Sequence, residues 1–239
     1  VTRSTTACFE PSLDYIVVKI PRWDLAKFER VSRDIGSAMK SVGEVMAIGR
    51  TFEESLQKAM RMTDTSVGGF EPSGTEYEGD EALESQIVYA NDRRIFAIAL
   101  ALQRGWSVDR IHALTAIDPW FLWKLKRISN IWSILREYSP ATLPVTALLQ
   151  AKKSGFSDAQ IAKYVGGTEM EMRETRKAMG VKPFVKQIDT MAAEFPAATN
   201  YLYMTYNGDE HDVVFDEPGT MVLGSGVYRL SGVPRMHER

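Results

Sequence analysis

The spacing of apolar residues near the start of the chain predicts two short strands. Residues 15–20 are rich in β-branched side chains and predict a strand that ends at the following proline. Residues 42–48 predict a second, buried strand, in which the small Gly43 and Gly49 let backbones approach closely. A carboxylate is costly to bury without a polar partner, so Glu44 either faces solvent at a strand edge or meets such a partner. The residues alone favour the exposed position, because glutamate is seldom fully buried.

Two short helices are predicted beside these strands. Asp24 can cap a helix that runs to about Val31, with its apolar side chains on one face. Thr51 and Glu54 have the spacing of a capping box. The helix that they open has apolar residues at helical intervals, namely Phe52, Leu56, Ala59 and Met60. Two strands and two helices cannot enclose a large core, so we expect residues 1–64 to complete a domain whose earlier strands lie elsewhere.

The composition changes between Asp64 and Asp92. This stretch contains eight acidic and no basic residues, with several glycines and a proline among them. Such a segment buries too little apolar area to offset the entropy lost on ordering. We therefore predict a solvated linker over residues 65–92, and an acidic binding tail is the less favoured alternative.

Residues 93–180 have the pattern of consecutive helices. Gly105 is placed to end the first of them. Asp118 followed by Pro119 opens the longest, over about residues 119–138. This helix is apolar over more than one stripe, so it is covered either by its own bundle alone or by its bundle and another subunit.

The next two predicted helices have the spacing of a helix-turn-helix. Capping-box pairs, Ser157 with Gln160 and Thr168 with Glu171, flank two glycines. A DNA-reading helix needs a basic surface for the phosphates, but residues 157–180 hold four basic and four acidic side chains. The net charge of −2 for the whole chain gives no further attraction. The pair is interpreted as bundle packing rather than as a nucleic-acid site.

The remaining composition excludes several classes of protein. The single cysteine, Cys8, rules out an internal disulfide framework and suits a reducing compartment such as the cytoplasm. No apolar run reaches the roughly 18 residues of a membrane-spanning helix. The three histidines, His112, His211 and His237, lack metal-ligand spacing. The first residues contain neither an initiator methionine nor an apolar signal core, so we expect a fragment of a longer protein.

An apolar run into a Gly-x-Gly turn lies at residues 221–229. Such turns can approach a phosphate, although a simple tight turn is the commoner reason for the pattern. No phosphate site is assigned there.

Several longer segments resemble the large subunit of carbamoyl-phosphate synthase. Residues 39–50 read MKSVGEVMAIGR, and residues 9–15 and 19–23 read FEPSLDY and KIPRW, in the order and spacing of that family. Its helical landmarks are matched by DRRIFA, IDPWFL, AKKSGF and KQIDTMAAEF at residues 92–97, 117–122, 151–156 and 186–195. Trp23 and the stretch YLYMTY at residues 201–206 are most similar to the eukaryotic form of this enzyme, which is part of a multifunctional pyrimidine-synthesis protein.

The resemblance implies an α+β chain that is mostly helical. Residues 1–64 would be the C-terminal piece of the first ATP-grasp half, which makes carboxyphosphate. Residues 93–218 would be a helical oligomerisation domain after the linker. Residues 219–239 would be a truncated start of the second half, because the match to the family fails after Arg229.

The resemblance also implies a function. The complete enzyme would use ATP with Mg²⁺ or Mn²⁺ to make carbamoyl phosphate for pyrimidine or arginine synthesis, with a glutaminase domain or subunit as partner. By position in the family motifs, Leu13, Met39 and Glu44 would line the tunnel that carries carbamate between the two halves. We expect no catalytic, cofactor-binding or metal-binding residue in this chain, no activity from it alone, self-association into a homo-oligomer, and neither a nucleic-acid nor a membrane partner. The rival hypothesis is a stand-alone helical interaction module derived from the synthase.

Overall fold

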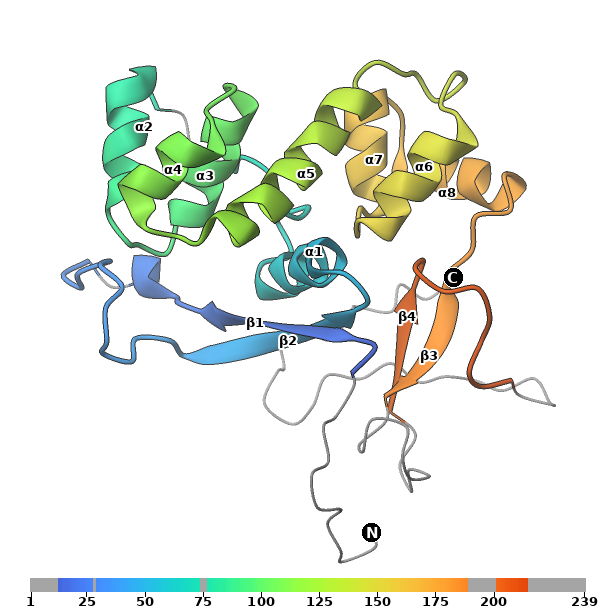
Figure 1. Cartoon of the computed structure of the whole chain (residues 1–239), viewed down its shortest axis with the longest axis horizontal. Coiled ribbons are helices and arrows are strands. Elements are labelled where there is room, and N and C mark those ends of the chain that lie inside the picture. Colours follow the sequence, from blue (N-terminus) through green and yellow to red (C-terminus); the bar gives the residue numbers. More distant parts are fainter. Residues whose placement is uncertain (1–12, 28, 74–76, 189–200, 215–239) are drawn as a thin grey trace, which may run out of the picture.

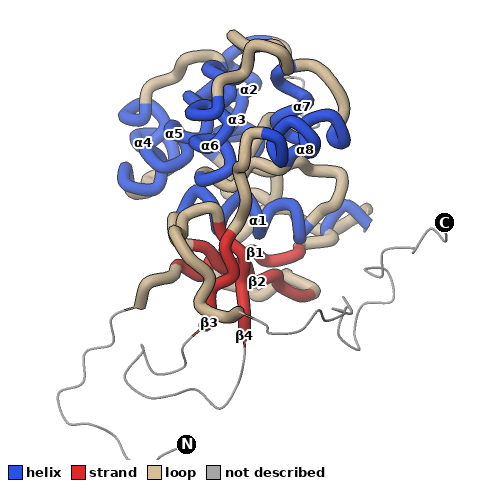
Figure 2. Tube along the Cα trace, turned by 90° about the vertical axis from the view of Figure 1, so that its right-hand side faces the viewer, coloured by secondary structure: helices blue, strands red, loops and turns tan. Residues whose placement is uncertain are grey.

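The fold places two small strand pairs on one side and a group of helices on the other. The computed structural model describes residues 13–27, 29–73, 77–188 and 201–214 (Figure 1). Figure 2 shows the helices above both strand pairs, with α1 between the first pair and the other helices. This is the mostly helical α+β architecture that was predicted.

The first strand pair is antiparallel and packs one face on helix α1. Strand β1 spans Ile16–Arg22 and β2 spans Gly43–Gly49, with Ile20 opposite Val45. Helix α1 spans Phe52–Thr63, and its fully buried Ala59 packs against Val45 of β2. The prediction that the proline ends β1 is wrong: Pro21 pairs with Glu44 and the strand continues, because an edge strand tolerates a missing N–H.

Strand β2 is buried on one face only. Val45 and Ala47 are buried, whereas Val42 and Met46 are exposed. The expectation of a strand buried throughout is therefore wrong, because alternate side chains of a strand point to opposite faces and α1 covers only one of them. The expectation that the two glycines let backbones approach closely is wrong: a Cβ on Gly49 would lie 2.8 Å from the carboxyl carbon of the Glu54 side chain, and Gly43 has nothing within 4 Å.

The helix predicted from Asp24 to Val31 is not formed. A single 3₁₀ turn, η1, spans Leu25–Lys27. Asp24 has a φ of 44°, not the extended backbone of an N-cap, and its carboxylate accepts hydrogen bonds from Arg22 and Lys27. Val31 is exposed rather than packed on a helical face.

The predicted linker is part of the helical core. Residues 79–88 form helix α2 (Gly79–Val88), in which Leu83 and Ile87 are fully buried. Phe70 is also fully buried and stacks on Trp132 with ring centroids 5.6 Å apart. The prediction failed because composition counts charges but does not say on which side of a segment they lie.

The other helices follow in chain order, and three of them begin directly after the predicted caps Asp118, Ser157 and Thr168. They are α3 (Arg94–Gln103), α4 (Val108–Thr115), α5 (Pro119–Leu135), α6 (Val145–Lys153), α7 (Asp158–Val165) and α8 (Glu169–Ala178). Asp118 caps α5 through a bond from the Trp120 N–H, and Gly105 follows α3 with a φ of 85°. The box at Thr168 and Glu171 is complete. Helix α5 ends at Leu135, three residues before the predicted limit.

A second antiparallel strand pair follows the helices. Strand β3 spans Phe184–Ile188 and β4 spans Tyr201–Thr205. The expectation that residues 93–218 are helical is therefore wrong at residues 184–188 and 201–205. The Gly-x-Gly stretch, Cys8 and residues 219–239 lie outside the described residues.

Candidate functional site

The three residues expected to line the carbamate tunnel lie on the surface of the described chain. Leu13 is 56% exposed and Met39 is 91% exposed. The side chain of Glu44 is 59% exposed. Leu13 precedes the start of β1, whereas Met39 and Glu44 lie near the start of β2, which is the other end of the antiparallel pair. A path that touches all three residues would have to run along the length of the sheet.

The outer face of this sheet, opposite α1, carries both charged and apolar side chains. Lys19 is opposite Met46 and Val17 is opposite Ile48, and residues paired in this way share a face. The Nζ of Lys19 lies 2.6 Å from an Oε1 atom of Glu44. We call these residues, Val17, Lys19, Glu44 and Met46, the outer sheet face. Glu44 is thus exposed, as the residues alone favoured, and it also has a polar partner.

A buried carboxylate on α1 joins this sheet to the second strand pair. Glu54 is 1% exposed. Its Oε2 accepts hydrogen bonds from the backbone N–H of Arg50 at 3.0 Å, Thr205 Oγ1 at 2.9 Å and Asn207 Nδ2 at 3.0 Å. Its Oε1 accepts from the Lys58 ammonium at 2.8 Å. One acidic side chain therefore joins residues 50–58 to residues 205–207, which lie about 150 positions away in the sequence.

The Lys58 ammonium extends the same junction. It donates to the carbonyl oxygens of Ile48 in β2 at 2.9 Å and Met204 in β4 at 2.6 Å. Asn207 donates to the carbonyl oxygen of Lys153 at the end of α6, at 2.7 Å. These bonds fix β2, β4 and α6 relative to α1. We call the set the Glu54 junction.

The capping-box prediction at Thr51 is half right. Thr51 Oγ1 accepts the N–H of Glu54 at 3.2 Å, as a cap should. The Glu54 carboxylate, however, takes the Arg50 N–H rather than that of Thr51, because it also faces strand β4. Sequence reasoning missed Thr205 and Asn207 altogether, since no local pattern marks partners about 150 residues apart.

A second buried cluster holds the chain that leaves α8. Asp158 accepts hydrogen bonds from Lys152 Nζ at 2.8 Å and Arg176 Nε at 3.0 Å. Arg176 Nη1 donates to the Val181 carbonyl oxygen at 2.9 Å, and both cations lie over the ring of Tyr206. Burial alone would raise the pKa of the Asp158 carboxyl, but its bonds to the two cations outweigh burial and keep the pKa below 3.8.

Helix α5 leaves an aromatic surface uncovered by the described residues. Trp120, Phe121 and Trp123 are all exposed. Trp120 meets Phe52 of α1 edge to face, with ring centroids 5.5 Å apart. We call these residues the α5 aromatic surface. Of the two alternatives for this helix, burial in its own bundle is confirmed for its inner stripe. The outer stripe contacts Phe52 but remains about half exposed in the described chain.

The titratable side chains of the described residues form no metal centre. No group of three or more His, Cys, Asp or Glu in the described ranges could hold a metal ion. His112 Nδ1 contacts the Ile117 carbonyl oxygen, and His211 Nδ1 accepts the Val185 N–H. In the same ranges, every helix is too short or too polar to cross a membrane.

A family model gives this geometry its context. The model described as the oligomerisation domain of the carbamoyl-phosphate synthetase large chain matches residues 44–180, which is more than half of the chain. The chain belongs to the carbamoyl-phosphate synthetase large-chain family. The matched range runs from β2 to the end of α8 without a break at residues 65–92. This continuity agrees with the packing of α2 into the helical core.

Relatives in this family match almost the whole chain. The arginine-specific large chain of carbamoyl phosphate synthase from Cutaneotrichosporon cutaneum is 61% identical over 96% of this chain. The multifunctional protein pyrABCN of Emericella nidulans and the mitochondrial carbamoyl-phosphate synthase [ammonia] of Rattus norvegicus are 55% and 53% identical, again over 96%. The chain spans only 19%, 10% and 16% of these three synthase-family proteins, respectively. It therefore corresponds to a segment of a large chain.

Similarity over this segment does not separate the forms of the family. In Schizosaccharomyces pombe, a mitochondrial arginine-specific large chain and the multifunctional protein ura1 are 56% and 55% identical to it. The resemblance to multifunctional proteins is thus confirmed, and arginine-specific chains are at least as similar, at 56% and 61% identity.

Proposed function

We propose that this chain is the central segment of a carbamoyl-phosphate synthase, where it joins the two ATP-using halves and forms part of the carbamate path. The observation that carries the proposal is the outer sheet face. A two-stranded sheet is marginal on its own. In the described chain, α1 covers one of its faces, and the other presents Val17, Lys19, Glu44 and Met46. Such a sheet is suited to be covered on this face by another layer of the first synthetase half.

The chemistry of the whole enzyme explains why such a face would be useful. In the proposed synthase, ATP phosphorylates bicarbonate to carboxyphosphate, ammonia displaces phosphate to give carbamate, and a second ATP phosphorylates carbamate. Carbamate decomposes in water, so it must pass between the sites without release. Leu13 and Met39 would exclude water from the path, and the Glu44 carboxylate would accept hydrogen bonds from the carbamate N–H groups.

The positions of these side chains support a path along the outer sheet face. Leu13 lies at one end of the β1–β2 pair, and Met39 and Glu44 lie at the other. All three are exposed and so available to a covering domain. Lys19 gives Glu44 a counter-charge that would lower the cost of burying it under that domain.

ATP and its Mg²⁺ or Mn²⁺ are proposed to bind in the two halves, outside these residues. The described side chains offer no group able to hold a metal, and no step of the reaction is assigned to them. A glutaminase domain or subunit would supply the ammonia. The proposed compartment is the cytoplasm, although some relatives are named as mitochondrial.

Self-association is proposed through the α5 aromatic surface. Exposed aromatic clusters are characteristic of interface cores, and the family model is named for oligomerisation. In sedimentation, Trp123→Ser in the full protein should shift the oligomer toward monomer. Tyr89→Ser, at an exposed tyrosine that follows α2, should leave it unchanged. Equal behaviour of the two variants would argue against this surface.

The segment hypothesis is tested by the full protein that contains this chain. That protein should form carbamoyl phosphate from bicarbonate, ammonia and two ATP, whereas residues 1–239 alone should neither bind nor hydrolyse Mg-ATP in titration calorimetry. If the full protein also fails to use ATP, the chain is a stand-alone interaction module instead.

A further inference from the structure

The two strand pairs meet at Arg50, the residue that follows strand β2. The backbone N–H of Arg50 donates to the buried Glu54 carboxylate at 3.0 Å. Its side chain donates in two other directions, from Nη2 to Asp14 Oδ2 at 2.6 Å and from Nε to the hydroxyl oxygen of Tyr203 at 3.4 Å. Arg50 therefore bonds to helix α1, to the stretch of chain before β1 and to strand β4 at once.

An arginine suits this position because its guanidinium group is a planar fork. Its N–H donors have a fixed geometry and can reach two acceptors in different directions, whereas a lysine ammonium is a point charge on a flexible stem. The Arg50 side chain is only 28% exposed, and Tyr203 is buried. These contacts therefore differ from a fully exposed ion pair, which would contribute little.

The bond to Asp14 holds the stretch of chain that carries Leu13. Asp14 follows Leu13 directly, and β1 begins two residues later. The next side chain, Tyr15, has its ring centroid 6.4 Å from that of Tyr203, within the range of interacting aromatic pairs. Contacts with Arg50 and Tyr203 therefore fix the backbone on which Leu13 stands.

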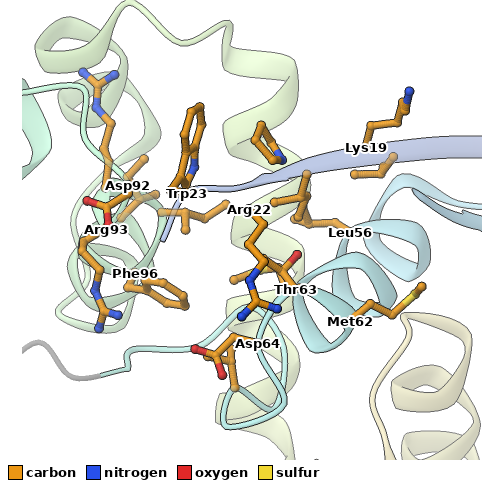
Figure 3. Close-up of a pocket in the computed structure, with 18 of the residues that line it drawn as sticks. Lys19, Arg22, Trp23, Leu56, Met62, Thr63, Asp64, Asp92, Arg93 and Phe96 are labelled. Carbon is orange, nitrogen blue, oxygen red and sulfur yellow. The ribbon is translucent and has the colours of Figure 1, made fainter. Parts of the chain in front are cut away.

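The proposed carbamate path has this stretch at one end and Glu44 at the other. Glu44 lies near the start of β2, at the opposite end of the β1–β2 pair. Figure 3 shows Lys19, the ion-pair partner of Glu44, projecting from the side of β1 opposite Leu56 of α1. The path would follow this outer face, so its two ends must keep their places along the whole length of the sheet.

We propose that Arg50 is a positioning residue for the transfer of carbamate. It acts through Leu13 rather than on carbamate itself, by holding the Leu13 stretch against β4. In the sequence, β4 precedes residues 219–239, which resemble the start of the second half. Without the Arg50 side chain, the Leu13 stretch is released and water enters the path, where carbamate decomposes before the second phosphorylation. This inference rests on the proposed function, because it needs Leu13 to line the path.

The test measures how many ATP molecules the full protein consumes for each carbamoyl phosphate formed. Intact transfer gives a ratio of about two, because one ATP makes carboxyphosphate and the other phosphorylates carbamate. In Arg50→Gln, loss of carbamate to water should raise this ratio severalfold. The bicarbonate-dependent ATPase of the first half, and ATP formation from carbamoyl phosphate and ADP in the second, should both stay near wild type. Arg110→Gln is the matched control: Arg110 of α4 donates to Glu84 of α2 at 2.8 Å, and its loss should leave the ratio unchanged.

Further variants separate positioning from folding. Asp14→Ala removes the other partner of the ion pair at a side chain that is 64% exposed, so the ratio should rise while the thermal midpoint stays unchanged. Because both substitutions break the same pair, the double variant should lose no more carbamate than Arg50→Gln alone. Arg50→Lys should give an intermediate ratio, since a lysine cannot bond to Asp14 and Tyr203 together in the same geometry.

The outcomes distinguish this inference from the function on which it rests. A wild-type full protein that forms no carbamoyl phosphate overturns the proposed function itself. If wild type forms it and both Arg50→Gln and Asp14→Ala keep the wild-type ratio, only the positioning role is overturned. A fall of synthesis and both partial reactions together, with a lower thermal midpoint in Asp14→Ala, would make the pair structural and would also overturn that role.

Discussion

Lys19 and Glu44 form an ion pair, with Nζ and Oε1 2.6 Å apart, on the face of the β1–β2 sheet opposite α1. Both side chains are more than half exposed, and exposed pairs typically contribute less than about 1 kcal/mol to folding. Stability therefore does not explain the pair. If another domain of the synthase covers this face, the lysine gives the carboxylate the partner that burial requires. Glu44 is then exposed in this segment and buried against a polar partner in the complete enzyme.

Replacing Glu44 by Ala in the full protein should uncouple the two halves. The bicarbonate-dependent ATPase of the first half should stay near wild type, and so should ATP formation from carbamoyl phosphate and ADP in the second. Overall synthesis should fall severalfold, because only the transfer of carbamate is impaired. The measurement is all three rates on a single preparation.

The matched control for this experiment is Glu174→Ala. Glu174 is also exposed and ion-paired, with Lys177 on α8. It should change none of the three rates, since surface substitutions usually alter stability by less than about 0.5 kcal/mol. An equal loss of all three rates in Glu44→Ala would indicate a structural role, and no loss would indicate an ordinary surface residue.

Glu54→Gln should loosen the second strand pair from the rest of the chain. The substitution leaves the half-buried Lys58 ammonium without its counter-charge, and breaking a buried pair in this way costs about 3–5 kcal/mol. Hydrogen exchange should show faster exchange of amides at residues 201–207, which the Glu54 junction holds.

Glu53→Gln tests whether that effect belongs to the junction. Glu53 is also buried, but its partners Lys124 and Arg127 are more distant, at 3.6 and 3.4 Å. This variant should lose less stability and keep the exchange of residues 201–207 slow. Similar exchange in the two variants would mean that the junction does not hold β4.

Local signals in the sequence located most of the helices. Asp118 and Thr168 start helices where they were expected to, because an N-cap acts within one turn of its own backbone. Asp24 failed as a cap because its carboxylate is held by two cations, Arg22 and Lys27. No pattern in the sequence around Asp24 indicates that its carboxylate bonds to these cations rather than capping a helix.

Long-range packing explains what sequence reasoning missed. Residues 65–92 were interpreted as a linker from their charge, yet Phe70 and Ile87 enter a core formed with helices more than 10 residues away. The Glu54 junction depends on Thr205 and Asn207, which no pattern connects to α1. The tunnel residues could be named only through the family resemblance, and their exposure shows that this segment alone does not enclose a path.

Phe70→Ala should destabilise the helical core. The ring is fully buried and stacks on Trp132, and truncation of such a side chain costs about 3–5 kcal/mol. Chemical denaturation of wild type and variant measures the loss. Tyr89→Ala, which removes an exposed ring from the same stretch of sequence, should cost less than about 0.5 kcal/mol. If the two variants were equally stable, residues 65–92 would behave as the linker first expected.

The stability of the chain in acid should depend on Asp158. Its carboxyl has a pKa below 3.8 in the folded protein: burial opposes ionisation, but the bonds to Lys152 and Arg176 prevail. A depressed carboxyl pKa contributes stability that is fully present above the unfolded value, near 3.8, and is lost as pH falls through the folded value.

Asp158→Asn should therefore be less stable than wild type by about 3–5 kcal/mol at pH 7, because two buried cations lose their partner. The gap between wild type and variant should narrow as pH falls below about 4, since protonation removes the same charge from wild type. Urea unfolding at pH 7, 5 and 3 measures the gap, with Asp80→Asn, at an exposed partner of Arg104, as the control that should show almost none. A gap that stayed constant over this range would mean that Asp158 acts through its shape rather than its charge.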